Sequence, residues 1–195
     1  MLTSDLRGAT PALEVIENPI SGERITILEP AAATGGDHLA FELLLRPRGR
    51  VPSGHIHPNQ VETFAVLDGT IRFRRGWHVV HAGPGDSVVM PRGTFHTFLN
   101  PGCYPARALV VTRPALRMED VLRRGAQLGR RQAAAGRGAL WAAEVLEFLA
   151  EYQAEVAAPL APAWLVGLAG AAARWLLRMR SRRDPLTVHT TEEGA

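Results

Sequence analysis

The chain has no lysine and only one cysteine, and its N-terminus has no apolar stretch. All 22 basic residues are therefore arginines, and against 19 acidic residues they leave a formal net charge of +3. The pI of about 9.9 reflects arginine as the only basic residue type and gives no argument for a nucleic-acid partner. We predict that the protein does not bind nucleic acid.

Cys103 stands alone, so no disulfide can form within the chain and nothing indicates an oxidising compartment. Residues 1–10 include Asp5 and Arg7 and lack the apolar core of a secretory signal. We therefore expect a cytoplasmic protein. With 195 residues, 46% of them hydrophobic, one globular domain with an appendage is expected.

Residues 13–113 read as short strands, because apolar and polar side chains alternate along them. Leu39 and Phe41 share one face of an extended segment, with Glu42 on the other. Clusters of glycine and proline separate the strands and predict turns at 18–22, 34–37 and 82–85. This spacing of strands and turns indicates an all-β barrel or sandwich.

After Pro114 the sequence changes to alanine, leucine, arginine and glutamate at helical spacing. Trp141, Val145, Phe148 and Tyr152 fall on one stripe of a predicted amphipathic helix. A second, solvated acidic stripe comprises Glu144, Glu147, Glu151 and Glu155. We predict helices over roughly 116–131, 139–157 and 163–180.

A set of potential metal ligands begins with His55 and His57, which lie two residues apart. On a strand, such residues project from the same face, so both imidazoles can point at one spot inside a barrel. Glu62 follows after a short turn, and a turn at Pro91 and Gly93 introduces His96 from a neighbouring strand. His78 and His81, at a spacing of three, are expected to face solvent.

The two stretches that contain these residues resemble the two sequence motifs of the cupin superfamily. The first stretch reads G-x5-H-x-H-x4-E-x6-G from Gly49 to Gly69, and the second reads G-x5-P-x-G-x2-H-x3-N from Gly85 to Asn100. All ten specified positions match, which makes the signal specific. The whole chain also resembles bacterial single-cupin proteins that carry a helical C-terminal extension.

The resemblance implies a mainly β fold, a double-stranded β-helix or jelly-roll cupin barrel, followed by an α-helical C-terminal extension. It also implies one divalent transition metal, which can be Fe, Mn, Ni, Cu, Co or Zn, bound by His55, His57, Glu62 and His96. The expected division of the chain is an N-terminal arm over 1–12, the barrel over 13–113, the helical extension over 114–180 and a disordered tail over 181–195.

Strand parity gives candidates for the substrate pocket. Phe64 and Val66 share parity with Glu62, and Phe98 shares it with His96. Taken singly, each of these side chains is expected in the ordinary barrel core more than in the pocket wall. The candidate substrate contacts are Gln60, Phe64, Val66, Phe73, Met90 and Phe98, where Gln60 either binds a ligand or metal-bound water or caps the loop before Glu62.

The last predicted helix is uncharged over 162–173 and rich in arginine over 174–183. It is too short to span a bilayer. We expect it to pack on the barrel or on a second subunit in preference to lying on a membrane surface. A homodimer is the expected assembly, by family resemblance and by the frequency of two-fold symmetric oligomers.

Three functions fit these features. The first is a metal-dependent enzyme, an oxygenase or an isomerase or lyase, that acts on an oxygen-rich small organic molecule, with Glu62 as a possible base. The second is a non-catalytic cupin that binds a small ligand. The third, a metal-free sugar-nucleotide epimerase, fits less well because the full set of four ligands is present.

Overall fold

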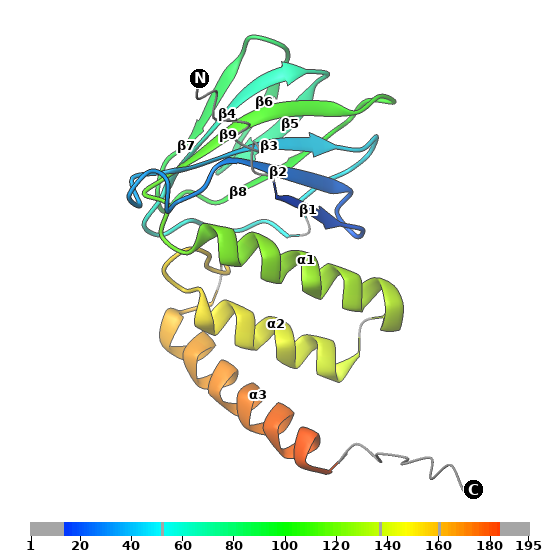
Figure 1. The fold of residues 1–195 in the computed structure, drawn as a ribbon, viewed down its shortest axis with the longest axis vertical. Coiled ribbons are helices and arrows are strands. Elements are labelled where there is room, and N and C mark those ends of the chain that lie inside the picture. Colours follow the sequence, from blue (N-terminus) through cyan, green and yellow to red (C-terminus); the bar gives the residue numbers. More distant parts are fainter. Residues whose placement is uncertain (1–13, 52, 137, 160, 184–195) are drawn as a thin grey trace, which may run out of the picture.

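Two antiparallel sheets stand above a stack of three helices (Figure 1). The computed structural model describes residues 14–51, 53–136, 138–159 and 161–183, so the predicted arm over 1–12 lies outside the described residues. The strands are β1 (Val15–Asn18), β2 (Glu23–Glu29), β3 (Leu39–Leu45), β4 (Val61–Asp68), β5 (Ile71–Arg75), β6 (His78–Ala82), β7 (Ser87–Met90), β8 (His96–Leu99) and β9 (Ala106–Arg113). The mainly β fold with a helical extension is confirmed.

The larger sheet has the order β1-β2-β3-β9-β4-β7, and the smaller has the order β6-β5-β8. The hydrophobic core lies between them, as the predicted alternation requires. In β3 the buried side chains include Leu39, Phe41 and Leu43, and in β5 Phe73 is buried while its neighbour Arg72 is exposed.

Aromatic side chains from both sheets meet in this core. Phe64 of β4 lies 5.0 Å from Phe73 of β5 and 5.3 Å from Phe98 of β8, measured between ring centroids. The three rings are tilted toward one another, a favourable arrangement for aromatic pairs. They pack the two sheets against each other in the hydrophobic core.

The helices are α1 (Met118–Ala135), α2 (Ala139–Glu151) and α3 (Ala163–Arg183). The first helix begins later than predicted, since Leu116 has a left-handed backbone (φ 46°). At its other end, the helix is capped by Gly136 (φ 73°), which follows Ala135. Acidic residues in its first turn interact favourably with the positive end of the helix dipole, which stabilises the helix N-terminus at this position. The third helix continues through Arg183, so residues 181–183 are helical where the tail was predicted, and the rest of that prediction lies outside the described residues.

The second helix ends six residues earlier than the predicted boundary at 157. No proline or glycine interrupts the helical pattern before Pro159, which is why the sequence favoured a longer helix. In the structure the chain turns after Glu151 and Ala157 pairs with Ile56, whose backbone groups exchange two hydrogen bonds with those of Ala157. Glu155 is consequently buried, and its predicted place on a solvated stripe is wrong.

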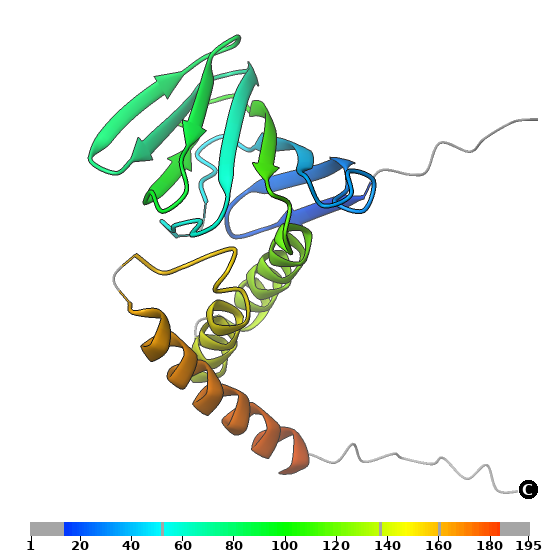
Figure 2. The ribbon, with the colours of Figure 1, turned by 90° about the vertical axis from the view of Figure 1, so that its left-hand side faces the viewer.

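Both ribbon views show the helices layered below the barrel, with α1 against the sheets, α2 next and α3 outermost (Figures 1 and 2). Close contacts at glycines allow this layering. A Cβ on Gly129 of α1 would lie 2.2 Å from Asn18 Oδ1, and one on Gly170 of α3 would lie 2.2 Å from the Cβ of Ala150. None of the described helices is both long and apolar enough to cross a membrane.

We expect Gly129→Ala to destabilise the protein, because the new methyl group overlaps Asn18, whose side chain accepts hydrogen bonds from the backbone of Ile20 and Ser21. Gly125→Ala on the same helix meets nothing within 4 Å and is the matched control. Alanine is favoured over glycine in a helix by up to about 1 kcal/mol, so this variant should be as stable as wild type or more stable. Urea unfolding midpoints measure the stability of both variants. Equal midpoints for the two would contradict the close approach of α1 to Asn18.

Candidate metal centre

Three different segments contribute the four predicted ligands. His55 and His57 lie in the connection between β3 and β4, Glu62 is the second residue of β4, and His96 is the first residue of β8. The expectation that the first two histidines sit on a regular strand is only partly met. His55 forms an isolated bridge with His96, through backbone hydrogen bonds of 3.1 and 2.9 Å, and this bridge aligns the two segments.

The structure brings the four side chains together. The ring centroids of His55, His57 and His96 are 4.5 to 5.1 Å apart, and one ligand atom from each lies within 4.8 Å of the others. Glu62 Oε2 lies 3.5 Å from His57 Nε2 and 3.3 Å from His96 Nε2. Three imidazoles and a carboxylate gathered in this way are a ligand set for a divalent transition metal.

Backbone carbonyls fix which nitrogen of each ring carries hydrogen. The Nδ1 atoms lie 3.0 Å from the Ser53 carbonyl for His55, 2.6 Å from the Glu155 carbonyl for His57 and 3.1 Å from the Thr94 carbonyl for His96. A carbonyl oxygen can only accept a hydrogen bond, so each Nδ1 must be the donor. In the neutral rings Nε2 then carries the free lone pair, which is the form that binds a metal.

Several atoms at this point have no hydrogen-bond partner although they are buried. They are Nε2 of His57, Nε2 of His96 and Oε2 of Glu62. A buried polar group without a partner destabilises the folded protein by about 1–3 kcal/mol. A cation bound by these atoms would satisfy all three at once, so the residues present fit a metal ion.

The electrostatics of the cluster favour a neutral His55 and an anionic Glu62. Burial and the neighbouring rings of His96 and His57 lower the pKa of His55 to about 3. Burial alone would raise the pKa of Glu62, but His57 and His96 lower it well below its usual value. Burial alone would lower the pKa of His57, whereas Glu62 and the Glu155 carbonyl raise it. Glu62 is therefore an anion between the rings.

The helical extension contributes directly to this centre, which the sequence did not reveal. The Glu155 carbonyl that fixes His57 comes from the turn after α2. The same turn pairs with the ligand segment through Ala157, and Asn59 Nδ2 donates a hydrogen bond of 2.9 Å to the Ala154 carbonyl. The turn 152–157 thus holds the loop that carries two of the four ligands.

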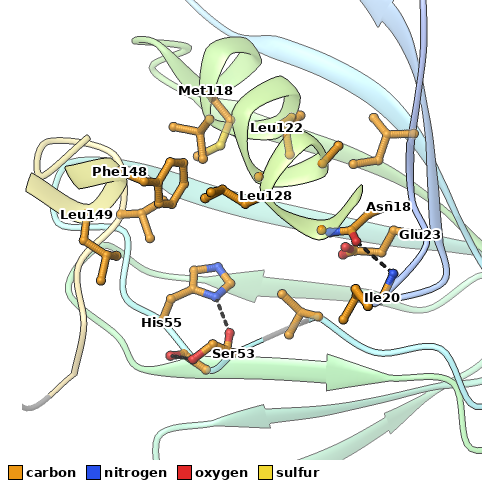
Figure 3. Close-up of a pocket in the computed structure, with 18 of the residues that line it drawn as sticks. Asn18, Ile20, Glu23, Ser53, His55, Met118, Leu122, Leu128, Phe148 and Leu149 are labelled. Carbon is orange, nitrogen blue, oxygen red and sulfur yellow. Dashed lines mark hydrogen bonds between the residues drawn. The ribbon is translucent and has the colours of Figure 1, made fainter. Parts of the chain in front are cut away.

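A cavity of about 320 Å³ opens beside the ligands, between the barrel and the helices. His55, His57 and Glu62 line it from the barrel side, and Figure 3 shows Met118 and Leu122 of α1 and Phe148 of α2 on the opposite wall. Most of its lining is apolar. The fold therefore places a chamber of ligand size against the metal centre.

Among the polar residues on the cavity wall, Asn18 and Glu23 were not candidates from the sequence (Figure 3). Burial raises the pKa of Glu23 to about 7, and the charge of Glu62 adds to that effect, while a hydrogen bond from Ser21 opposes it. No ion pair to Glu23 occurs among the described residues. Strand alternation gave a weak signal for Glu23, since it lies on the same face of β2 as the buried Ile25 and Ile27.

The candidate substrate contacts divide into two groups. Phe64 and Phe98 line the cavity. Val66, Phe73 and Met90 instead pack in the hydrophobic core, because strand parity places a side chain inside the barrel without deciding whether it lies near the opening. Gln60 is also fully buried, and its Nε2 donates hydrogen bonds to the carbonyls of Pro114 and Ala115, which ties the ligand loop to the start of the extension.

Motif residues that do not face the metal centre have structural roles. Asn100 Nδ2 donates to the carbonyls of Leu45, Arg46 and Tyr104, and its Oδ1 accepts a hydrogen bond from the backbone of Gly102. Gly69 has a positive φ of 70°, and a Cβ there would lie 2.8 Å from the Pro105 carbonyl. These residues shape the turns that join the strands.

Residues 41–112 match the family of cupin domains, and the match includes all four predicted ligands. The barrel is a cupin domain. The helices of the extension lie outside the matched residues. His78 and His81 are exposed on β6 of the cupin domain, as predicted, and Cys103 is a free, exposed cysteine.

Individual similar proteins cover only part of the chain. Germin-like protein 1 of Brassica napus is 36% identical over 84 residues, and this chain spans about two fifths of the length of that relative, since the match covers 39% of this chain and 40% of that protein. A sugar phosphate isomerase of the cupin superfamily from Silicibacter pomeroyi is 26% identical, covering 48% of this chain and 60% of its own, with a TM-score of 0.42. An oxalate oxidase in complex with glycolate is 23% identical, covering 48% and 52%, also with a TM-score of 0.42.

We expect Glu23→Gln to change the pH dependence of stability in protein treated with chelator. The folded state holds the proton of Glu23 up to a pKa of about 7, whereas the unfolded chain releases it near the usual pKa of 4.5. Wild type should therefore lose stability relative to the variant as pH rises from about 5 to about 7.5, by up to about 3 kcal/mol. Urea unfolding at both pH values measures the difference, and parallel profiles would show that Glu23 is not buried in this way.

Proposed function

We propose that this protein is a metal-dependent enzyme of the cupin type that binds one divalent transition metal through His55, His57, Glu62 and His96. The observation that carries the proposal is the convergence of buried Nε2 atoms on a carboxylate, with Nδ1 of each ring held by a backbone carbonyl. Among the described residues, Nε2 of His57, Nε2 of His96 and Oε2 of Glu62 have no hydrogen-bond partner. A metal ion is the partner that the arrangement fits.

The location of the centre supports a catalytic role over a structural one. Structural metal sites are closed by protein ligands, whereas catalytic sites keep a position open to substrate. His57 and His96 are 4% and 1% exposed, whereas His55 is only partly buried and borders the cavity. The side of the centre that faces the cavity is where a small molecule would reach the metal.

When bound, the metal would supply Lewis-acid or redox chemistry to a molecule that coordinates it through oxygen. The chain's own residues prepare that chemistry. Glu62 would provide a negative charge to a bound metal, and Phe64 and Phe98 contribute apolar surface to the adjoining cavity. The lowered pKa of Glu62 favours its role as a ligand over its possible role as a base, since a weakly basic carboxylate accepts protons poorly near neutral pH.

The reaction is proposed as an oxygenation or as an isomerisation or lyase reaction of a small organic molecule. A non-catalytic ligand-binding cupin is the second candidate, and the mostly apolar cavity wall contributed by the helices favours it. A homodimer and a cytoplasmic location stay predictions from the sequence. Exposed Trp164, Leu168 and Trp175 on α3 are an apolar surface that a second chain could bury.

We expect the protein purified without chelator to contain about one transition-metal ion per chain, measured by elemental mass spectrometry. The double variant His55→Ala/His57→Ala should lose the metal, because two of the four ligands are removed. The matched control is His78→Ala/His81→Ala, which removes two exposed histidines from β6 and should keep the metal. Absence of metal from wild type, even after reconstitution with each candidate ion, would rule out the metalloenzyme.

The metal-loaded protein should also turn over a substrate, which separates the enzyme from the ligand-binding alternative. Oxygen consumption with small phenolic, enolic and thiol compounds tests the oxygenase. Solvent deuterium incorporation, followed by NMR, tests isomerisation. We expect one of these signals in wild type and a loss of at least a hundredfold in Glu62→Ala. Tight binding of a compound without either signal would favour the non-catalytic protein.

A further inference from the structure

The cavity has two walls of different character. On the barrel side it borders the metal ligands, and on the helix side it is formed by apolar residues of α1 and α2, among them Met118, Leu122 and Phe148 (Figure 3). Gly125 of α1 also lines it, and a Cβ at that position would meet nothing within 4 Å. The absence of a side chain at Gly125 therefore leaves free space inside the cavity.

Polar side chains line the cavity at the metal centre, at the pair Asn18 and Glu23, and at Ser53 and Gln132. Figure 3 shows Asn18 and Glu23 across the cavity from His55. The carboxyl group of Glu23 faces the cavity without an ion-pair partner among the described residues. A carboxyl group without an ion-pair partner in a largely apolar wall is a potential recognition point for a ligand.

We propose that the cavity binds an elongated amphipathic molecule, with an oxygen-bearing head at the metal centre, an apolar body along α1 and α2, and a hydrogen-bonding group at Asn18 and Glu23. This inference rests on the proposed function only in that the head coordinates the metal. It replaces the oxygen-rich substrate expected from the sequence with a ligand that has few oxygen atoms. Further oxygen atoms buried against the apolar wall would have no hydrogen-bond partner.

The size and chemistry of the cavity agree with such a ligand. Its volume of about 320 Å³ corresponds to roughly ten water molecules at about 30 Å³ each. This volume suits a short hydrocarbon chain with a small polar head. Burying apolar surface strengthens binding by roughly fourfold for each methylene. A neutral carboxyl group at Glu23 can both donate and accept a hydrogen bond.

The test uses acetohydroxamate and octanohydroxamate, two metal chelators with the same head and different chain lengths, titrated calorimetrically into the full-length, metal-loaded protein. We expect octanohydroxamate to bind at least a hundredfold more tightly. Gly125→Leu, which fills the free space, should remove this advantage and leave the acetohydroxamate affinity and the metal content unchanged. Ala133→Leu, on an exposed position of the same helix, is the matched control and should behave as wild type.

The distal polar pair is tested with 8-hydroxyoctanohydroxamate. Wild type should bind it at least as tightly as octanohydroxamate, because Glu23 or Asn18 pairs with the hydroxyl group. Glu23→Leu should reverse the preference by about tenfold, since a buried hydroxyl group without a partner weakens binding. An equal penalty for the hydroxyl group in wild type and in this variant would overturn the assignment of the distal site.

The outcomes separate this inference from the proposed function. If metal and acetohydroxamate bind but chain length has no effect on affinity, the proposal of an amphipathic ligand is wrong. The same holds if Gly125→Leu and Ala133→Leu behave alike. In either case the proposed metal centre is not contradicted. If the protein binds no metal, the proposed function fails. If His55→Ala/His57→Ala bound octanohydroxamate as tightly as wild type, the placement of the head at the metal would be wrong.

Discussion

The hydrogen bond between His57 Nδ1 and the Glu155 carbonyl joins the two halves of this protein. A buried imidazole needs a partner for its N–H group, and here that partner belongs to the helical extension rather than to the barrel. The neighbouring pairing of Ile56 with Ala157 fixes the same two segments in register. As a result the extension helps to form the candidate metal centre, and movement of the turn 152–157 would change the orientation of the His57 ring.

The other two rings are fixed in the same way but locally, by carbonyls two residues before each histidine. These bonds place hydrogen on Nδ1, so in the neutral rings the free lone pair lies on Nε2. Burial then disfavours protonation of His55, and the anionic Glu62 balances whatever positive charge the centre holds. The protein thus maintains a cluster that is poorly satisfied without a cation, which is the arrangement expected when a metal supplies the missing interactions.

Placement of the helices also decides what can reach the centre. The barrel alone provides the ligands and the aromatic base formed by Phe64 and Phe98. The helices supply the opposite wall, and small residues make this possible, since Gly129 allows α1 to approach Asn18 and Gly170 allows α3 to approach α2. A polar metal centre consequently faces a largely apolar chamber, and this contrast is the basis of the ligand class inferred above.

The sequence by itself determined the alternating strands and the identity of the four candidate ligands. Local spacing encodes both, because strand alternation has a period of two and the motif positions of Gly49 to Gly69 and Gly85 to Asn100 have fixed separations. Helical periodicity likewise gave the presence of three helices. Only the tertiary structure decided that α2 ends at Glu151, that Glu155 is buried, and that Val66, Phe73 and Met90 lie in the core rather than on the cavity wall. Those features, and the exposure of Glu23 to the cavity, depend on contacts between segments far apart in the chain, which no local pattern of residues records.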